Sequence, residues 1–117
     1  MKTLTIIGNI GKSVDMKFTP QGKPVTEFSV AVNEGKGENK KTEWVKVVAW
    51  EKVAEILNEY AKPGSKIFLS GMCKVEAWID KTSGEARAQN VLTVREFEFL
   101  GDATKRTLVQ DAEAEYA

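Results

Sequence analysis

Apolar and polar residues alternate along most of this chain, and a helical period interrupts that alternation once. In residues 43–50, Val45, Val47 and Ala49 fall on one side of an extended backbone. Residues 66–79 repeat the pattern over a longer stretch. Such alternation is typical of β-strands with one buried face, so the sequence predicts a mostly β protein.

Glycine, asparagine and proline divide the pattern into five predicted strands, at residues 4–8, 25–32, 43–50, 66–79 and 87–100. The segment Gly8-Asn9-Ile10-Gly11 is expected to break the first strand. Turns are expected at residues 19–22 and 80–85, and residues 33–42 are predicted to form a polar, lysine-rich loop.

The inner face of the fourth strand is predicted to consist of Ile67, Leu69, Gly71, Cys73, Val75, Ala77 and Ile79. Cys73 is the only cysteine of the chain, so it cannot form an internal disulfide. We expect it to be a small buried hydrophobic residue.

Residues 51–60 change to a helical period, with Val53, Ile56, Leu57 and Tyr60 on one side. The segment Lys62-Pro63-Gly64 is expected to end this helix. An all-β chain of five strands with one short helix between strands 3 and 4 is the order of the OB-fold, a partly open Greek-key barrel that binds oligonucleotides or oligosaccharides. The order suggests the fold without proving a ligand. We expect this domain to cover residues 1–101, and residues 102–117 to form a short, mildly acidic and flexible tail.

Composition argues against an enzyme. The chain has no histidine, and its 17 acidic residues are scattered among 17 basic ones. The commonest general base and metal ligand are therefore missing, and we expect neither a catalytic site, a metal nor a cofactor. No membrane segment or signal peptide is recognised, which predicts a cytoplasmic protein, nucleoid-associated or in a phage-infected cell.

All three tryptophans, Trp44, Trp50 and Trp78, fall on the strand faces opposite the aliphatic residues. Exposed indoles serve proteins that bind single strands as platforms on which bases stack. A contact between subunits is the alternative, since interfaces are also rich in tryptophan.

Lysines interleave with these rings. Lys46 lies between Trp44 and Trp50, Lys52 follows Trp50, and Lys74 precedes Trp78. This spacing suits contacts to a phosphate backbone, which add salt-dependent affinity without sequence information. In the predicted loop, Lys36, Lys40 and Lys41 either close over the strand or are simply solvated.

Taken together, the segments resemble the bacterial-type single-stranded DNA-binding protein (SSB) family over residues 3–101. The resemblance rests on Ile7-Gly8-Asn9-Ile10-Gly11, Phe18-Thr19-Pro20-Gln21-Gly22, Phe28-Ser29-Val30-Ala31-Val32-Asn33, Thr42-Glu43-Trp44, Val47-Val48-Ala49-Trp50, Lys52-Val53-Ala54-Glu55, Lys62-Pro63-Gly64-Ser65, Ser70-Gly71 and Phe99-Leu100-Gly101.

The resemblance implies a non-enzymatic protein that binds and protects single-stranded DNA in replication, recombination and repair, independently of base sequence and as a homotetramer. Its predicted DNA-binding residues are Trp44, Lys46, Trp50, Lys52, Lys74, Trp78, Lys36, Lys40, Lys62 and Phe18.

Two departures from the family stand out. Lys36 occupies a place where some members carry another tryptophan, and Ala88 replaces a frequent tyrosine, which predicts lower affinity. The tail ends in Tyr116-Ala117 in place of an acidic tip with a Pro-Phe pair, so recruitment of replication or repair proteins is not expected from that tip.

Two alternatives stay open. A primosome-type paralogue of the family would act mainly as a protein adaptor. A single-stranded RNA-binding module is the other, because Gly8-Asn9-Ile10-Gly11 fits the loop that clamps nucleotides in KH domains. That loop should join two helices, whereas here it follows a predicted strand, so a plain turn is preferred.

Overall fold

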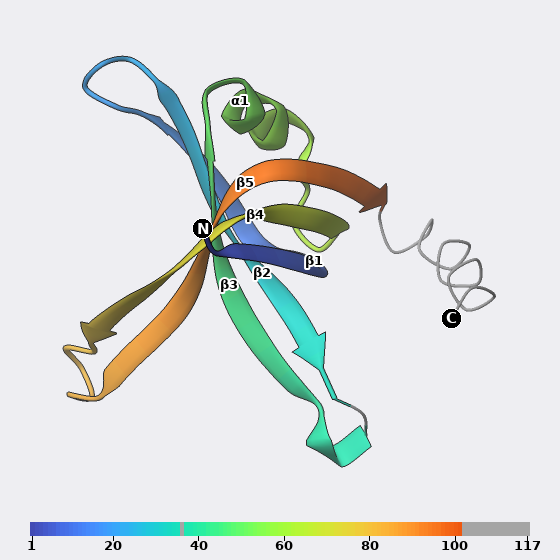
Figure 1. Ribbon diagram of the computed structural model, residues 1–117, viewed down its shortest axis with the longest axis vertical. Coiled ribbons are helices and arrows are strands. Elements are labelled where there is room, and N and C mark those ends of the chain that lie inside the picture. Colours follow the sequence, from blue (N-terminus) through green and yellow to red (C-terminus); the bar gives the residue numbers. More distant parts are fainter. Residues whose placement is uncertain (36, 102–117) are drawn as a thin grey trace.

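Five strands close into a barrel in the order β1-β2-β3-β5-β4, with β1 pairing with both β2 and β4 (Figure 1). The computed structural model describes residues 1–35 and 37–101. The elements are β1 (Thr3–Phe18), β2 (Pro24–Glu34), the short 3-10 helix η1 (Gly37–Asn39), β3 (Lys41–Trp50), α1 (Glu51–Tyr60), β4 (Lys66–Ile79) and β5 (Ala86–Gly101). The prediction of a five-stranded fold with one short helix between the third and fourth strands is confirmed. Within the described ranges, no helix is long and apolar enough to cross a membrane.

β1 is one continuous strand, so the predicted break at Gly8-Asn9-Ile10-Gly11 was wrong. The strand pairs with β4 up to Asn9 and with β2 from Asn9 onward, with a register shift after Ile10. A Cβ atom on Gly8 would collide with the carbonyl oxygen of Ala31. The missing side chain therefore lets β1 lie close against β2 as it changes partners, without ending the strand.

The core lies inside the barrel and is closed at one end by α1. It consists of Ile6, Ile10, Phe28, Val30, Val45, Val47, Ala49, Ala54, Leu57, Ala61, Ile67, Leu69, Leu92 and Val94. Buried Thr26 donates a hydrogen bond from Oγ1 to the carbonyl oxygen of Ala54 at 2.7 Å, which joins β2 to the helix. Tyr60, the last residue of α1, shares the helical spacing of Val53 and Leu57 but is 57% exposed.

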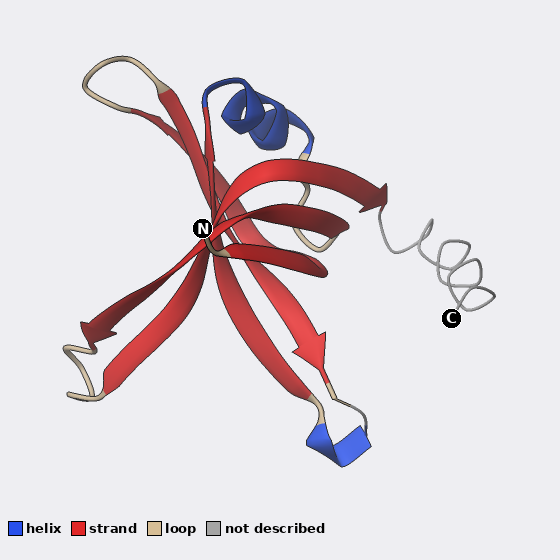
Figure 2. Cartoon of the chain, in the orientation of Figure 1, coloured by secondary structure: helices blue, strands red, loops and turns tan. Residues whose placement is uncertain are grey.

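The outer halves of β4 and β5 form a two-stranded arm that extends beyond the barrel (Figure 2). β5 pairs with β3 only between Val91–Thr93 and Lys46–Val48, so the rest of the arm has no third strand. The predicted inner face is therefore correct for Ile67, Leu69 and Gly71, which are buried. It is wrong for Val75, Ala77 and Ile79, which are exposed, and Cys73 is half-buried.

The β2–β3 hairpin projects on the same side of the barrel as the arm (Figure 1). Its strands reach Glu34 and start again at Lys41, so the predicted loop at residues 33–42 is shorter than expected. Lys36 and the predicted tail at residues 102–117 lie outside the described residues.

Candidate nucleic-acid interface

The three tryptophans point away from the core, as predicted. On β3, Val45, Val47 and Ala49 are buried whereas Trp44 and Trp50 are 52% and 45% exposed. Trp78 on β4 is 43% exposed. Indole rings left about half open to water are available to a flat, apolar ligand.

Strand register brings five of the ten predicted residues onto one surface. Lys46 of β3 lies beside Val91 of β5, which lies beside Lys74 of β4. Paired residues of neighbouring strands share a face of the sheet. We call this surface the tryptophan face and define it by its outward residues Trp44, Lys46, Trp50, Lys74, Glu76, Trp78, Arg87 and Gln89.

Trp44 and Trp78 line the same hollow, although 34 positions of sequence separate them. Its volume is about 470 Å³. It opens where β3 and β5 diverge, between the β2–β3 hairpin and the arm. Its walls are Thr42, Glu43, Trp44, Trp78, Ala86, Arg87, Ala88 and Gln89. The small side chain of Ala88, noted above as a departure from the family, leaves room in this hollow.

The ring of Trp44 is supported from below by Gly11. A Cβ atom on Gly11 would lie 3.3 Å from Cζ3 of Trp44 and 3.0 Å from the carbonyl oxygen of Ser29. The indole thus reaches across β2 to the backbone of β1 at Gly11, which has no side chain. This packing fixes the ring while about half of the residue stays exposed.

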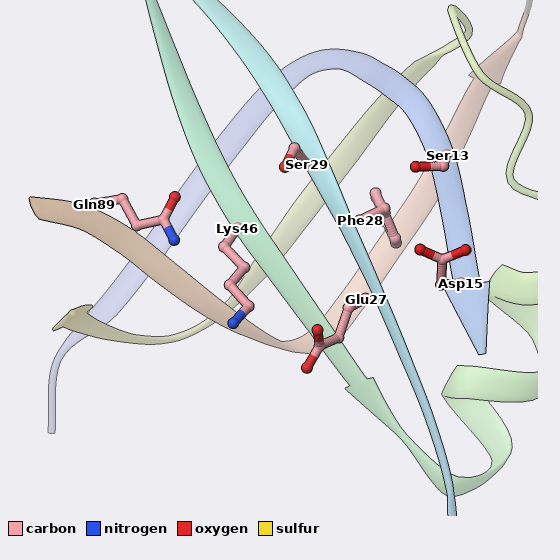
Figure 3. Close-up of a pocket in the computed structure, with 7 residues that line it drawn as sticks. All are labelled: Ser13, Asp15, Glu27, Phe28, Ser29, Lys46 and Gln89. Atoms are coloured by element: carbon pink, nitrogen blue, oxygen red, sulfur yellow. The ribbon is translucent and has the colours of Figure 1, made fainter. Parts of the chain in front are cut away.

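Lys46 occupies a neighbouring hollow of about 280 Å³ in which acidic residues outnumber it. Asp15 of β1 and Glu27 of β2 are directly opposite each other in register and line this hollow together with Lys46 (Figure 3). The ammonium Nζ of Lys46 lies 3.7 Å from Oε2 of Glu76 on β4. The ammonium of Lys46, which was predicted to contact phosphate, is therefore already paired with a carboxylate.

Trp50 lies apart from the other two rings. Six residues of extended strand separate it from Trp44, which corresponds to about 20 Å. It is the N-cap residue of α1, and the next residue, Glu51, has φ = 56°, in the left-handed region that residues other than glycine seldom adopt. This sharp transition from strand to helix holds Trp50 at the far end of the tryptophan face.

Apart from Lys74, the remaining predicted residues that the structure describes lie away from the tryptophan face. Lys74 is exposed on the tryptophan face, Lys52 is exposed on α1 and Lys62 in the turn after it, and Lys40 is exposed near the tip of the β2–β3 hairpin. None of these four lysines makes an ion pair with another residue of the described ranges. Phe18, at the end of β1, is 65% exposed but shares the strand parity of Met16 and Thr26, on the core side of the sheet.

Arg87 lies on the tryptophan face although it was not among the predicted site residues. It is directly opposite Trp78 and lines the hollow between the two rings. Its Nε donates to Oδ2 of Asp80 at 3.0 Å, and its guanidinium lies 3.7 Å from Glu85. The backbone N–H groups of Thr82 and Ser83, followed by Arg87, hold the pKa of Asp80 below its usual range. Counting back from the predicted turn at residues 80–85 would have paired Arg87 with Trp78.

The arrangement is suited to binding and contains two elements of single-strand recognition. Exposed indoles offer platforms for planar rings, and exposed lysines offer contacts for a charged backbone. The carboxylates around Lys46 reduce the positive potential at the centre of the face.

Comparison with known proteins agrees with this picture. The model of the single-strand binding protein family matches residues 1–100. Single-stranded DNA-binding protein 1 of Nostoc sp. is 31% identical over 103 residues, which cover 88% of this chain and 86% of that protein. The protein of the same name from Synechocystis sp. is 33% identical over 104 residues, with coverages of 86% and 84%, and that of Xylella fastidiosa is 30% identical over 118 residues, with coverages of 96% and 86%. The match spans nearly the whole barrel, so this chain belongs to the single-strand binding protein family and has its OB-fold.

Proposed function

We propose that this protein binds single-stranded DNA without base-sequence preference, by stacking bases on tryptophan and holding phosphates with lysine. The observation that carries the proposal is the hollow shared by Trp44 and Trp78, in which two half-exposed indoles from different hairpins face one space. Stacking on such rings tolerates any base, because every base has a π-face. Family membership and the names of the relatives support the same ligand and a role without catalysis.

The contacts fall into two groups. Trp44 and Trp78 stack bases at the hollow, and Trp50 stacks one about 20 Å further along β3. Lys46 and Lys74 hold phosphates beside the hollow, Lys40 does so near the tip of the β2–β3 hairpin, and Lys52 and Lys62 do so beyond Trp50, on α1 and in the turn after it. Lys36, which follows β2 in the sequence, and Phe18 at the end of β1 complete the proposed set of contacts.

We also propose that the protein acts as a homotetramer in the cytoplasm, protecting single strands exposed in replication, recombination and repair. Exposed apolar residues on the outer side of β1 and β4 support self-association, since Ile7 and Met72 are each 46% exposed there. Linked subunits would multiply the affinity of one barrel. Light scattering at micromolar concentration should give four times the mass of one chain, and a monomeric mass would contradict this part.

Titration of the intrinsic tryptophan fluorescence tests the central proposal. Oligo-dT should quench the fluorescence at saturation, and duplex DNA should compete poorly because its bases are already stacked. A parallel titration with oligo-rU separates DNA from RNA binding. No quenching and no mobility shift with oligo-dT at low salt would contradict the proposal, and would favour a protein adaptor.

The tryptophans also provide a test against the alternative of a subunit contact. Alanine at Trp44 or Trp78 should weaken DNA binding while the oligomeric mass stays the same. Alanine at Tyr60, an exposed aromatic residue on α1, is the matched control and should change neither. Normal binding by the Trp44→Ala protein together with dissociation into monomers would make this ring an interface residue.

A further inference from the structure

We propose that Glu76 competes with DNA phosphate for Lys46 and thereby sets the affinity and the salt dependence of binding. This inference rests on the proposed function and identifies a residue that regulates it. It assigns to a carboxylate of the tryptophan face a role opposite to that of the lysines around it.

An ion pair joins Lys46 to Glu76. Nζ of Lys46 lies 3.7 Å from Oε2 of Glu76, and the two side chains are 31% and 40% exposed. Both groups are reachable from solvent, so a phosphate can displace the carboxylate. The exchange nevertheless costs the energy of the existing pair, which lowers the net gain from the phosphate contact.

Glu76 lies on the tryptophan face next to both hollows. Glu76 is directly opposite Gln89, and Gln89 lines both the hollow of Lys46 and the hollow of Trp44 and Trp78. Trp78 follows Glu76 by two residues on the same side of β4. A strand that passes from one hollow to the other therefore crosses directly over this carboxylate.

Carboxylates outnumber ammonium groups in the neighbourhood of Lys46. Asp15 and Glu27 line the hollow of Lys46 and Glu76 pairs with its ammonium, so three carboxylates lie in or beside this hollow with one ammonium. Lys74, two residues before Glu76 on the same side of β4, makes no ion pair with another described residue. A phosphate that binds Lys74 displaces no ion pair among the described residues, whereas one that binds Lys46 must displace Glu76.

The test is a cycle of four proteins: wild type, Glu76→Gln, Lys46→Gln and the double variant. Each is titrated with oligo-dT at several salt concentrations. Glu76→Gln should bind about two- to fivefold more tightly than wild type at moderate salt, the range expected for removing one partly exposed ion pair. The slope of log K against log salt should steepen by up to about 0.7, the value for one phosphate contact on a single strand.

The double variant separates competition for Lys46 from simple repulsion of DNA. Glu76→Gln should bring no gain when Lys46 is already glutamine. Glu59→Gln on α1 removes an equal charge away from the face and should change the affinity little. A gain that persists in full in the Lys46→Gln background, or equal affinities of the Glu76→Gln and Glu59→Gln proteins, would overturn the inference alone. A wild-type protein that binds no single strand would overturn the proposed function as well.

Discussion

Asn90 of β5 donates a hydrogen bond from Nδ2 to Oε1 of Glu43 on β3 at 2.8 Å, close to the point where the two strands diverge. The last residues that pair β3 with β5 are Lys46 and Val91, one position away from Asn90. Glu43 also lines the hollow of Trp44 and Trp78. The bond therefore fixes how far the arm lies from the β2–β3 hairpin, and with it the spacing of the two rings.

Removing this bond should loosen the hollow. Asn90→Ala is expected to lower the free energy of unfolding by about 0.5–1.5 kcal/mol, as for a typical hydrogen bond. Asn90→Asp should be worse at neutral pH, because it sets a carboxylate against that of Glu43. Urea denaturation measures the free energy of unfolding of both variants. Values equal to that of the wild type would show that the bond does not form in solution.

The tryptophans should divide into one coupled pair and one independent ring. Alanine at Trp44, Trp50 or Trp78 should each weaken binding by about 1–3 kcal/mol. Trp44 and Trp78 line one hollow, so the effects of changing both should not add. Trp44 and Trp50 are about 20 Å apart along β3, so their effects should add to within about 0.5 kcal/mol. Double-mutant cycles measured with oligo-dT test this. Additive effects for Trp44 and Trp78 would contradict the proposal that the two rings bind the DNA together in one hollow.

Gly11 should act through Trp44. A methyl group there would lie 3.3 Å from the indole and 3.0 Å from the carbonyl oxygen of Ser29, closer than such contacts usually are. We expect Gly11→Ala to shift the ring and to weaken DNA binding less than Trp44→Ala does. In a protein with phenylalanine at Trp50 and Trp78, the emission maximum of Trp44 should move. An unchanged maximum and unchanged affinity would mean that the ring does not rest on Gly11.

The turn of the arm should loosen in acid. Hydrogen bonds from Thr82 and Ser83, and then Arg87, favour the ionised form of Asp80 and hold its pKa below the ordinary value of 3.8. Because the folded pKa is the lower one, the stabilisation is fully present above about pH 3.8 and is lost as the pH falls through the folded pKa. NMR titration of the Asp80 carboxyl carbon should show this pKa. Asp80→Asn should remove the acid dependence of the turn, and a titration at the ordinary value would contradict the proposed bonds.

Several features of the fold could be predicted from local patterns. The helix at residues 51–60 was predicted with the observed bounds, since its period differs from that of the strands and Pro63 and Gly64 follow it. The fourth strand at residues 66–79 was also correct. Val75, Ala77 and Ile79 continue the alternation of the core beyond the barrel, so the pattern alone could not show where burial ends. At Gly8 the sequence predicted a break, because a glycine that ends a strand and one that lets two strands approach closely look the same in the sequence.

The candidate site could be predicted in part for a similar reason. Strand parity shows which side a ring faces, and it placed all three tryptophans on the exposed side. Parity does not show which rings lie close together, since that depends on pairing between distant strands. The grouping of Trp44 with Trp78, and the pairing of Lys46 with Glu76, both depend on β5 lying between β3 and β4. Neither could be read from the sequence near those residues.

Asp15 of β1 and Glu27 of β2 face each other directly across the two strands. Like charges in opposite positions of a sheet destabilise it by about 0.2–1 kcal/mol. Glu27→Gln should therefore raise the free energy of unfolding by that amount, and Asp15→Asn should do the same. The free energy of unfolding of the double variant should exceed that of either single variant by little, because each change alone removes the repulsion.

Salt distinguishes this repulsion from an effect on packing. The Debye length falls to about 3 Å in 1 M salt, so the gain should nearly vanish there if charge is its cause. Denaturation midpoints at low and high salt measure it, with Glu55→Gln on exposed α1 surface as the control for loss of one acid. The same variants should bind oligo-dT more tightly at low salt, since both carboxylates line the hollow of Lys46. A stability gain that is as large at 1 M salt as at low salt would show that the two carboxylates do not repel each other in the folded protein.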